Sequence, residues 1–217
     1  MPAERSAPEG ASLLVLLAWG NAAAHGAGLI VAWLALRPGS LVLPLAPRMH
    51  YLAASSAGWR WGWGIWMLCA VLLVSFVVVL RRQIPGDPVA AQLAVLLTGA
   101  GMPVDLLCDA LQIQALPLAA RAGPGLFLVL DRLAFFGSLT VANGLYTIGV
   151  LLLNVCVRGA VGPLARGAGW ATVVSGLILA IEGTAPSPAL LAVATGATLG
   201  FYSLWAVRVA YDLRGPR

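Results

Sequence analysis

Long apolar runs, separated by short polar or proline-containing breaks, make up most of this chain. A helix that crosses a bilayer needs about 20 predominantly apolar residues. Six runs qualify: Ala11–Leu36, Trp61–Leu80, Val89–Leu116, Gly125–Val157, Ala168–Glu182 and Pro188–Tyr211. The fourth is long enough to tilt or to project from the bilayer, and the fifth is short and ends at the turn "GTAPSP". The pattern predicts an all-α fold, a polytopic integral membrane bundle of about six transmembrane helices.

The breaks between the runs predict one domain with short tails. No internal repeat is evident and no linker marks a second domain, so we expect residues 11–211 to form a single transmembrane domain. Residues 1–10 and 212–217 would then be cytoplasmic tails. Residues 37–60 are too broken by proline to span, but they are apolar enough to lie in the membrane interface or to fold back. We expect this segment to be an extracytoplasmic interfacial loop.

The placement of arginine predicts the orientation of the bundle, because cytoplasmic flanks of membrane helices carry an excess of basic residues. With a cytoplasmic N-terminus, eight arginines lie inside: Arg5, Arg81, Arg82, Arg158, Arg166, Arg208, Arg214 and Arg217. Five lie outside: Arg37, Arg48, Arg60, Arg121 and Arg132. We therefore expect both termini in the cytoplasm and the protein in the inner (plasma) membrane.

Composition excludes several classes of function. Only 10% of the residues are charged, against roughly 25% in a soluble domain. The net charge of +5 is explained by the cytoplasmic flanks, so nucleic acid is not expected as a partner. The chain has no lysine, which excludes a lysine Schiff base. It also has no serine-hydrolase, zinc-protease, P-loop or dinucleotide motif, and we expect no cofactor. The three cysteines fall within apolar runs and should pack as small hydrophobic side chains.

Four acids lie inside the expected spans: Asp105, Asp109, Asp131 and Glu182. A charge inside a bilayer costs at least about 2.5–3.5 kcal/mol on insertion scales, so such residues normally face a cavity or a partner. Under the predicted orientation all four belong to the outer half of the bundle. The segment with Arg48, His50, Arg60 and the tryptophans around residue 63 lies on the same side. These tryptophans are typical of an interfacial belt, and an aromatic wall that stabilises a cation is the alternative.

Helical spacing groups the polar side chains into three faces. At about 100° per residue, Asp105, Asp109 and Gln112 share one face of the third span, whereas Gln114 points away. Pro103 precedes this group and is expected to open the helix there. The fourth span predicts a second stripe, which consists of Arg132, Asn143, Tyr146 and Asn154. Asn21 and His25, four residues apart, form the third on the first span.

These faces predict an intramembrane polar pocket. Two close carboxyl groups in a low dielectric cannot easily both ionise, so one should keep its proton near neutral pH and serve as a general acid or a proton carrier. We assign the catalytic roles to Asp105 and Asp109. The candidate substrate-binding residues are Gln112, Asp131, Arg132, Asn143, Tyr146, Glu182, His25, Asn21 and Trp63, with His50 near the mouth. A purely structural alternative pairs the two acids with Arg132 or Arg121.

Asp105 and Asp109 with His25 could chemically ligate a metal ion, but nothing in their spacing requires one, and we expect none.

The leading hypothesis is a membrane enzyme or binding protein that acts on a lipophilic small molecule entering from the lipid bilayer. Acid-initiated cyclisation or isomerisation of a lipid or isoprenoid suits the residues available. The second hypothesis is a proton-coupled carrier or carrier subunit. The third is a structural or assembly subunit that works with a membrane-protein partner.

Overall fold

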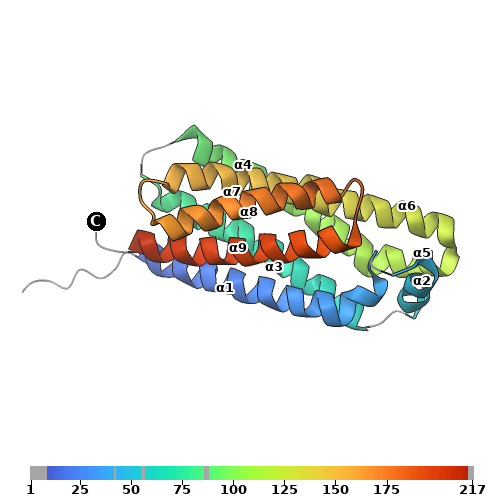
Figure 1. Ribbon diagram of the computed structural model, residues 1–217. Coiled ribbons are helices and arrows are strands. Elements are labelled where there is room, and N and C mark those ends of the chain that lie inside the picture. Colours follow the sequence, from blue (N-terminus) through green and yellow to red (C-terminus); the bar gives the residue numbers. More distant parts are fainter. Residues whose placement is uncertain (1–8, 42, 55–56, 86–87, 215–217) are drawn as a thin grey trace, which may run out of the picture.

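The structure, a computed structural model, describes residues 9–41, 43–54, 57–85 and 88–214, which are helical almost throughout and contain no strand (Figure 1). Its α-helices are α1 (Glu9–Val31), α2 (Leu45–Ala53), α3 (Ala57–Gln83), α4 (Val89–Ala110), α5 (Leu116–Ala122), α6 (Pro124–Phe135), α7 (Asn143–Val157), α8 (Pro163–Glu182) and α9 (Pro188–Arg214). Three short π-helical segments, Ala32–Leu36, Leu111–Ala115 and Phe136–Ala142, and one 3-10 turn, Arg37–Gly39, extend or join them.

Within the described ranges, six stretches are long and apolar enough to cross a membrane, which confirms the predicted all-α bundle. In chain order, these spans are Ser12–Gly39, Ala57–Gln83, Val89–Ala122, Pro124–Val157, Pro163–Glu182 and Pro188–Arg214. The fifth span begins five residues before the expected Ala168, at a proline in the first helical turn. Proline is favoured there because its fixed φ suits the helix and its missing N–H would have no intrahelical partner.

Successive spans run in opposite directions, so that α1 begins and α9 ends at the same end of the bundle (Figure 1). We call this the terminal end, and the opposite end the cap end. The third and fourth spans have 34 residues each, about 50 Å of helix, whereas α8 has 20 residues, about 30 Å. The third and fourth spans therefore reach beyond the α8–α9 turn, and with α2 they form the cap end, on the right of Figure 1.

The segment expected as an interfacial loop, residues 37–60, folds back onto the bundle and is largely helical. It contains the 3-10 turn, α2 and the first turn of α3. Tyr51 Oη donates a hydrogen bond of 2.6 Å to the carbonyl of Ala35, and Arg121 Nε donates one of 2.9 Å to the carbonyl of Ala53. These bonds attach α2 to the first and third spans.

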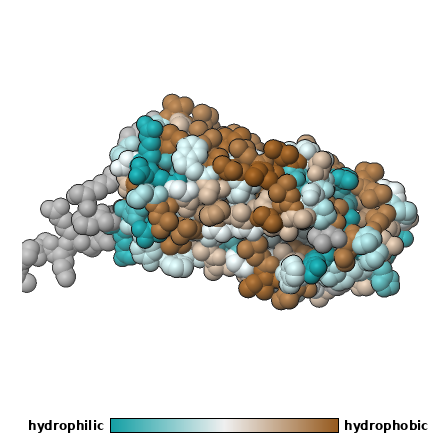
Figure 2. Space-filling view, viewed as in Figure 1, coloured by the Kyte–Doolittle hydropathy of each residue, from teal (hydrophilic) through white to brown (hydrophobic). Residues whose placement is uncertain are grey.

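Buried apolar side chains form two clusters along the bundle axis. The larger fills the terminal half, where Phe76, Leu80 and Trp205 have no exposed surface. The smaller lies at the cap end around Leu52 and Phe127. Outside the bundle, large apolar side chains face outward, and Figure 2 shows them as a broad hydrophobic surface, with hydrophilic side chains gathered at the terminal end. This distribution is what a lipid solvent requires.

A seam of small and polar residues joins the fourth span to α8. A Cβ atom added at any of three glycines, spaced seven residues apart on the fifth span and its C-terminal cap, would collide with a polar side chain of the fourth span. The pairs are Gly169 with Asn154, Gly176 with Thr147, and Gly183 with Thr140. The two helices run antiparallel, and the pairs repeat every seven residues. Because glycine has no side chain, the two helix backbones can approach closely at each pair, as they do at small residues in other membrane bundles.

Candidate functional site

A cavity of about 670 Å³ lies in the cap half of the bundle, between the two apolar clusters. All six spans and α2 contribute to its wall. This volume falls within the usual range of small-molecule pockets, about 300–1,000 Å³. Apolar groups make up most of the wall, and the polar side chains that it includes are His25, Arg37, Ser40, Arg48, Asp105, Asp109, Gln112, Asp131, Ser138, Asn143, Tyr146, Thr147, Thr172, Thr195, Thr198 and Tyr202.

Asp105 and Asp109 both line this cavity, one helical turn apart on α4. Asp105 accepts a hydrogen bond of 2.6 Å from Ser138 Oγ on the fourth span. Asp109 is 1% exposed, and its Oδ2 has no hydrogen-bond partner among the described residues. The Tyr146 hydroxyl lies beside Asp105 without completing a hydrogen bond of good geometry. The two acids thus differ, since one is held by a hydroxyl and the other has an acceptor atom unused.

Gln112 completes the face that helical spacing predicts, and Gln114 is exposed on the opposite side. The helix passes through Pro103 without a break, and the irregular turn comes later, in the π-helical segment that contains Gln112. The Gln112 carbonyl accepts a hydrogen bond of 2.6 Å from Trp59 Nε1. A π-helical turn leaves backbone groups outside the regular ladder, and such turns recur at functional sites.

Tryptophans of α3 form one wall of the cavity. Trp59, Trp63 and Trp66 all line it, and the Trp59 and Trp63 rings pack edge to face with centroids 5.6 Å apart. The Nε1 atoms of Trp63 and Trp66 are buried and have no acceptor among the described residues. Trp61, in contrast, is 77% exposed, as a belt residue would be. The tryptophan group is therefore divided between the cavity and the surface.

His25 lines the cavity, whereas Asn21 lies behind it. His25 Nδ1 is 2.8 Å from the carbonyl of Asn21, so this nitrogen carries the hydrogen. The ring of His25 packs edge to face on Tyr202, with centroids 5.2 Å apart. Asn21 is fully buried and donates 2.9 Å hydrogen bonds to the carbonyls of Leu17 and Leu72. Asn21 therefore holds the helices that carry the wall and does not contribute to the wall itself.

An ion pair between α2 and α6 is the feature that sequence reasoning missed. Arg48 Nη2 is 2.7 Å from Asp131 Oδ1, and both side chains are only 5% exposed. Arg48 Nε also donates to the carbonyl of Gly39 at 3.1 Å, and its guanidinium lies 5.3 Å from the Phe127 ring centre. Asp131 Oδ2 has no partner among the described residues. In the sequence, Arg48 is visible only as an arginine in a segment interrupted by prolines. That pattern does not identify Asp131, 83 positions away, as its partner.

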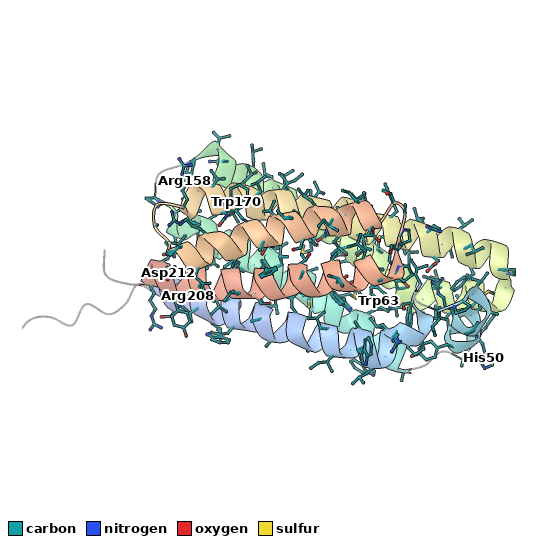
Figure 3. The ribbon with its side chains drawn as sticks, in the orientation of Figure 1. His50, Trp63, Arg158, Trp170, Arg208 and Asp212 are labelled. Carbon is teal, nitrogen blue, oxygen red and sulfur yellow. The ribbon has the colours of Figure 1, made fainter. Side chains whose placement is uncertain are left out.

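Three of the residues assigned to the site from the sequence, and His50, lie away from the cavity. Arg132 is exposed, and neither it nor Arg121 pairs with Asp105 or Asp109 in the described part of the chain. Glu182 is buried in the α8–α9 turn, where it accepts a 2.5 Å hydrogen bond from the backbone N–H of Ser187. Asn21 is the third, as described above. His50 is exposed and points outward at the cap end (Figure 3).

The π-helical segment of the fourth span explains why Asp131, and not Arg132, faces the cavity. A regular helix would place Arg132 about 20° from Asn143, eleven residues on. The π-helical segment Phe136–Ala142 lies between them, and a π bulge acts as an insertion of one residue. The phase shifts by about one position, so that Asp131 shares the cavity face with Asn143 and Tyr146.

Asn143 is held at the wall by a hydrogen bond of 2.9 Å from its Nδ2 to the carbonyl of Gly176.

Among the described residues, no three His, Cys, Asp or Glu side chains converge in a way that could hold a metal ion. The chain matches no known protein family, no curated protein and no solved structure. Its function must therefore be argued from the cavity.

The cavity offers one kind of chemistry above others. Its polar wall combines carboxyl groups with hydroxyl and indole donors. Of its two arginines, Arg48 is engaged by Asp131, whereas Arg37 is exposed and lies 4.3 Å from the ring centre of Trp33. An acidic site of this kind can transfer protons and can bind hydroxyl or amine groups. Apolar and aromatic surface surrounds these groups and accommodates a hydrophobic body.

Proposed function

We propose that this membrane protein admits a lipophilic small molecule from the bilayer into the cap-half cavity and acts on it by acid–base chemistry. The observation that carries the proposal is the juxtaposition, in a largely apolar cavity of about 670 Å³, of Asp105 and the neighbouring Tyr146 hydroxyl with the unpartnered Asp109 Oδ2. Buried polar atoms without partners are uncommon in proteins, and a ligand with complementary groups would satisfy them.

The position of the mouth supports access from lipid. Several lining residues are also exposed on the outside of the bundle, namely Trp33 and Arg37 on the first span and Ala189 and Ala192 on α9. The exposed apolar side chains Leu34 and Val193 flank them. The mouth is thus framed by two membrane-spanning helices, and a hydrophobic molecule could enter without crossing water.

The two acids would have different roles. The hydrogen bond from Ser138 favours the charged form of Asp105 and suits it as the base, while Asp109, without such a donor, would be the acid. The acid would protonate a carbon–carbon double bond, the faces of Trp59, Trp63 and Tyr202 would stabilise the cation, and the base would remove a proton from another carbon. Such an isomerisation or cyclisation is balanced without an oxidant or cofactor.

Asp105→Asn and Asp109→Asn test the proposal. Lipophilic compounds extracted from the purified wild-type protein and each variant would be compared by mass spectrometry, after expression in the same membrane. We expect one compound to accumulate unconverted with either variant, because each substitution removes a proton-transfer group. The matched control is Glu182→Gln, which removes a buried carboxylate outside the cavity. Identical extracts from all four proteins would refute acid–base turnover.

A carrier or a structural subunit has less support. A carrier must open the site alternately to both faces, and the terminal half is closed by fully buried side chains such as Phe76 and Trp205. A structural subunit has no use for unpartnered polar atoms beside a cavity.

For localisation we propose a multi-pass protein of the inner membrane with its terminal end in the cytoplasm. The arginines that belong to that end are Arg81, Arg82, Arg158, Arg166, Arg208 and Arg214.

A further inference from the structure

A second hollow lies on the outside of the bundle toward its terminal end, beyond the cavity residues Val150 and Thr172. It measures about 200 Å³ and is lined by Asn154, Val155, Arg158, Arg166 and Trp170, from α7, its C-terminal cap and α8. Figure 3 places Arg158 and Trp170 at this end, which also carries Arg208 and Asp212. We propose that this hollow binds the anionic headgroup of a phospholipid in the adjacent membrane leaflet.

The two arginines are available for a ligand. Both are exposed, and neither has an acid or another hydrogen-bonding group as its side-chain partner among the described residues. By contrast, Arg208 at the same end is paired with Asp212 at 3.3 Å. Two guanidinium groups that face one hollow can bind a phosphate through several charge-assisted hydrogen bonds. Basic pockets between transmembrane helices are known to hold lipid headgroups in this way.

The floor of the hollow is held by hydrogen bonds of a buried side chain. Asn154 is 2% exposed, its Oδ1 accepts a 3.2 Å hydrogen bond from Trp205 Nε1, and its Nδ2 donates to the carbonyl of Arg166 at 3.4 Å. Gly169 leaves room for this amide, because a Cβ atom there would collide with it. The floor of the hollow therefore belongs to the α7–α8 packing, and its rim consists of the exposed side chains of Val155, Arg158, Arg166 and Trp170.

The surroundings favour a lipid over a soluble phosphate. Trp170 lies one turn from Arg166 along α8 and is 50% exposed, as expected of a residue at the membrane interface. One turn further, Val174 is 58% exposed, and Val155 of α7 is also exposed. The order of arginine, tryptophan and aliphatic side chains matches the order of headgroup, interface and acyl chain in a phospholipid.

The test compares two double variants with the same loss of charge at the same end of the protein. R158Q/R166Q removes the headgroup ligands, and the control R82Q/R214Q removes two exposed arginines outside the hollow. Binding of dioleoylphosphatidylglycerol and dioleoylphosphatidylcholine to the purified full-length protein would be measured by native mass spectrometry. Each arginine near an anionic lipid contributes about 1 kcal/mol to binding, and about 1.4 kcal/mol changes the dissociation constant tenfold. We therefore expect R158Q/R166Q to bind phosphatidylglycerol about thirtyfold more weakly. The control should bind it like the wild type, and phosphatidylcholine binding should not change.

Competition with inorganic phosphate and with glycerophosphoglycerol distinguishes the two sources of the anion. Neither should displace phosphatidylglycerol, because neither has acyl chains. Displacement by either would mean that the hollow binds a soluble anion and would overturn the proposal. So would an equal loss of binding in both double variants, or a loss in neither. If R158Q/R166Q does not fold, Arg158→Gln alone is decisive, with about a fivefold loss expected.

Discussion

The Arg48–Asp131 ion pair is a buried charged contact between α2 and α6, and its contribution to stability depends on burial. Removing one partner from a buried pair leaves an uncompensated charge in a low dielectric, which typically costs about 3–5 kcal/mol. The pair also connects α2 to the cavity wall, since both side chains line the cavity. It therefore combines a structural role with a place next to the proposed ligand.

We expect Arg48→Met to destabilise the protein by about 3–5 kcal/mol, because Asp131 would remain buried without a counter-charge. Thermal unfolding in detergent, followed by circular dichroism, measures this effect. The control Arg208→Met breaks a pair in which the arginine side chain is 43% exposed, and it should cost less than about 1 kcal/mol. Adding Asp131→Leu to Arg48→Met should recover much of the loss. Equal destabilisation by the two single variants would contradict this account.

At the level of secondary structure, helix contacts rely on glycines placed opposite polar side chains. The glycines of α8 and its cap, at positions 169, 176 and 183, face the fourth span in a seven-residue register. In lipid, no hydrophobic effect drives one helix against another, so close backbone approach and dispersion contacts take its place. The seam keeps Asn143 against the carbonyl of Gly176 and thereby orients a cavity residue.

Gly176→Ala should destabilise the protein by about 1–3 kcal/mol, because the new methyl group would collide with Thr147 in a packed interface. The matched control is Gly167→Ala on the same helix, where a Cβ atom meets nothing within 4 Å. Thermal unfolding of the two variants provides the comparison. The double variant Gly176→Ala/Thr147→Ala should recover stability, since it removes the colliding hydroxyl. Failure to recover would indicate that α7 and α8 are held in another way.

The described part of the molecule has two different halves along its axis. The terminal half is filled by apolar side chains, and the cap half contains the cavity with its acids. Such a division suits a protein that must remain sealed on one side while a ligand enters on the other. The arginine distribution predicts that the sealed side faces the cytoplasm.

Cysteine labelling in whole cells tests this orientation. Thr184→Cys lies exposed in the α8–α9 turn, and Gly159→Cys lies exposed in the α7–α8 turn at the terminal end. We expect a membrane-impermeant maleimide to label residue 184 in intact cells, and residue 159 only after lysis. A background lane with the three native cysteines, Cys69, Cys108 and Cys156, serves as the control. The opposite labelling pattern would reverse the predicted topology.

The sequence by itself determined the elements and part of the site. Each span could be located because the length of an apolar run, compared with the bilayer thickness, is a local property. The shared face of Asp105, Asp109 and Gln112 followed equally well. No irregular turn separates the two aspartates, and Gln112 lies only two residues past the end of the helix that carries them.

Only the tertiary structure decided which polar groups meet across helices. The π-helical segment Phe136–Ala142 shifts the phase of the fourth span, so Asp131 replaces Arg132 on the cavity face. The fold of α2 brings in Arg48 as its partner, and Glu182 stays in its own turn. The spacing of polar residues along a span predicts a shared face only if the helix is regular. It contains no information on how a span is rotated about its own axis or on which distant segments it contacts. Those depend on how all six spans pack together, which no single stretch of sequence specifies.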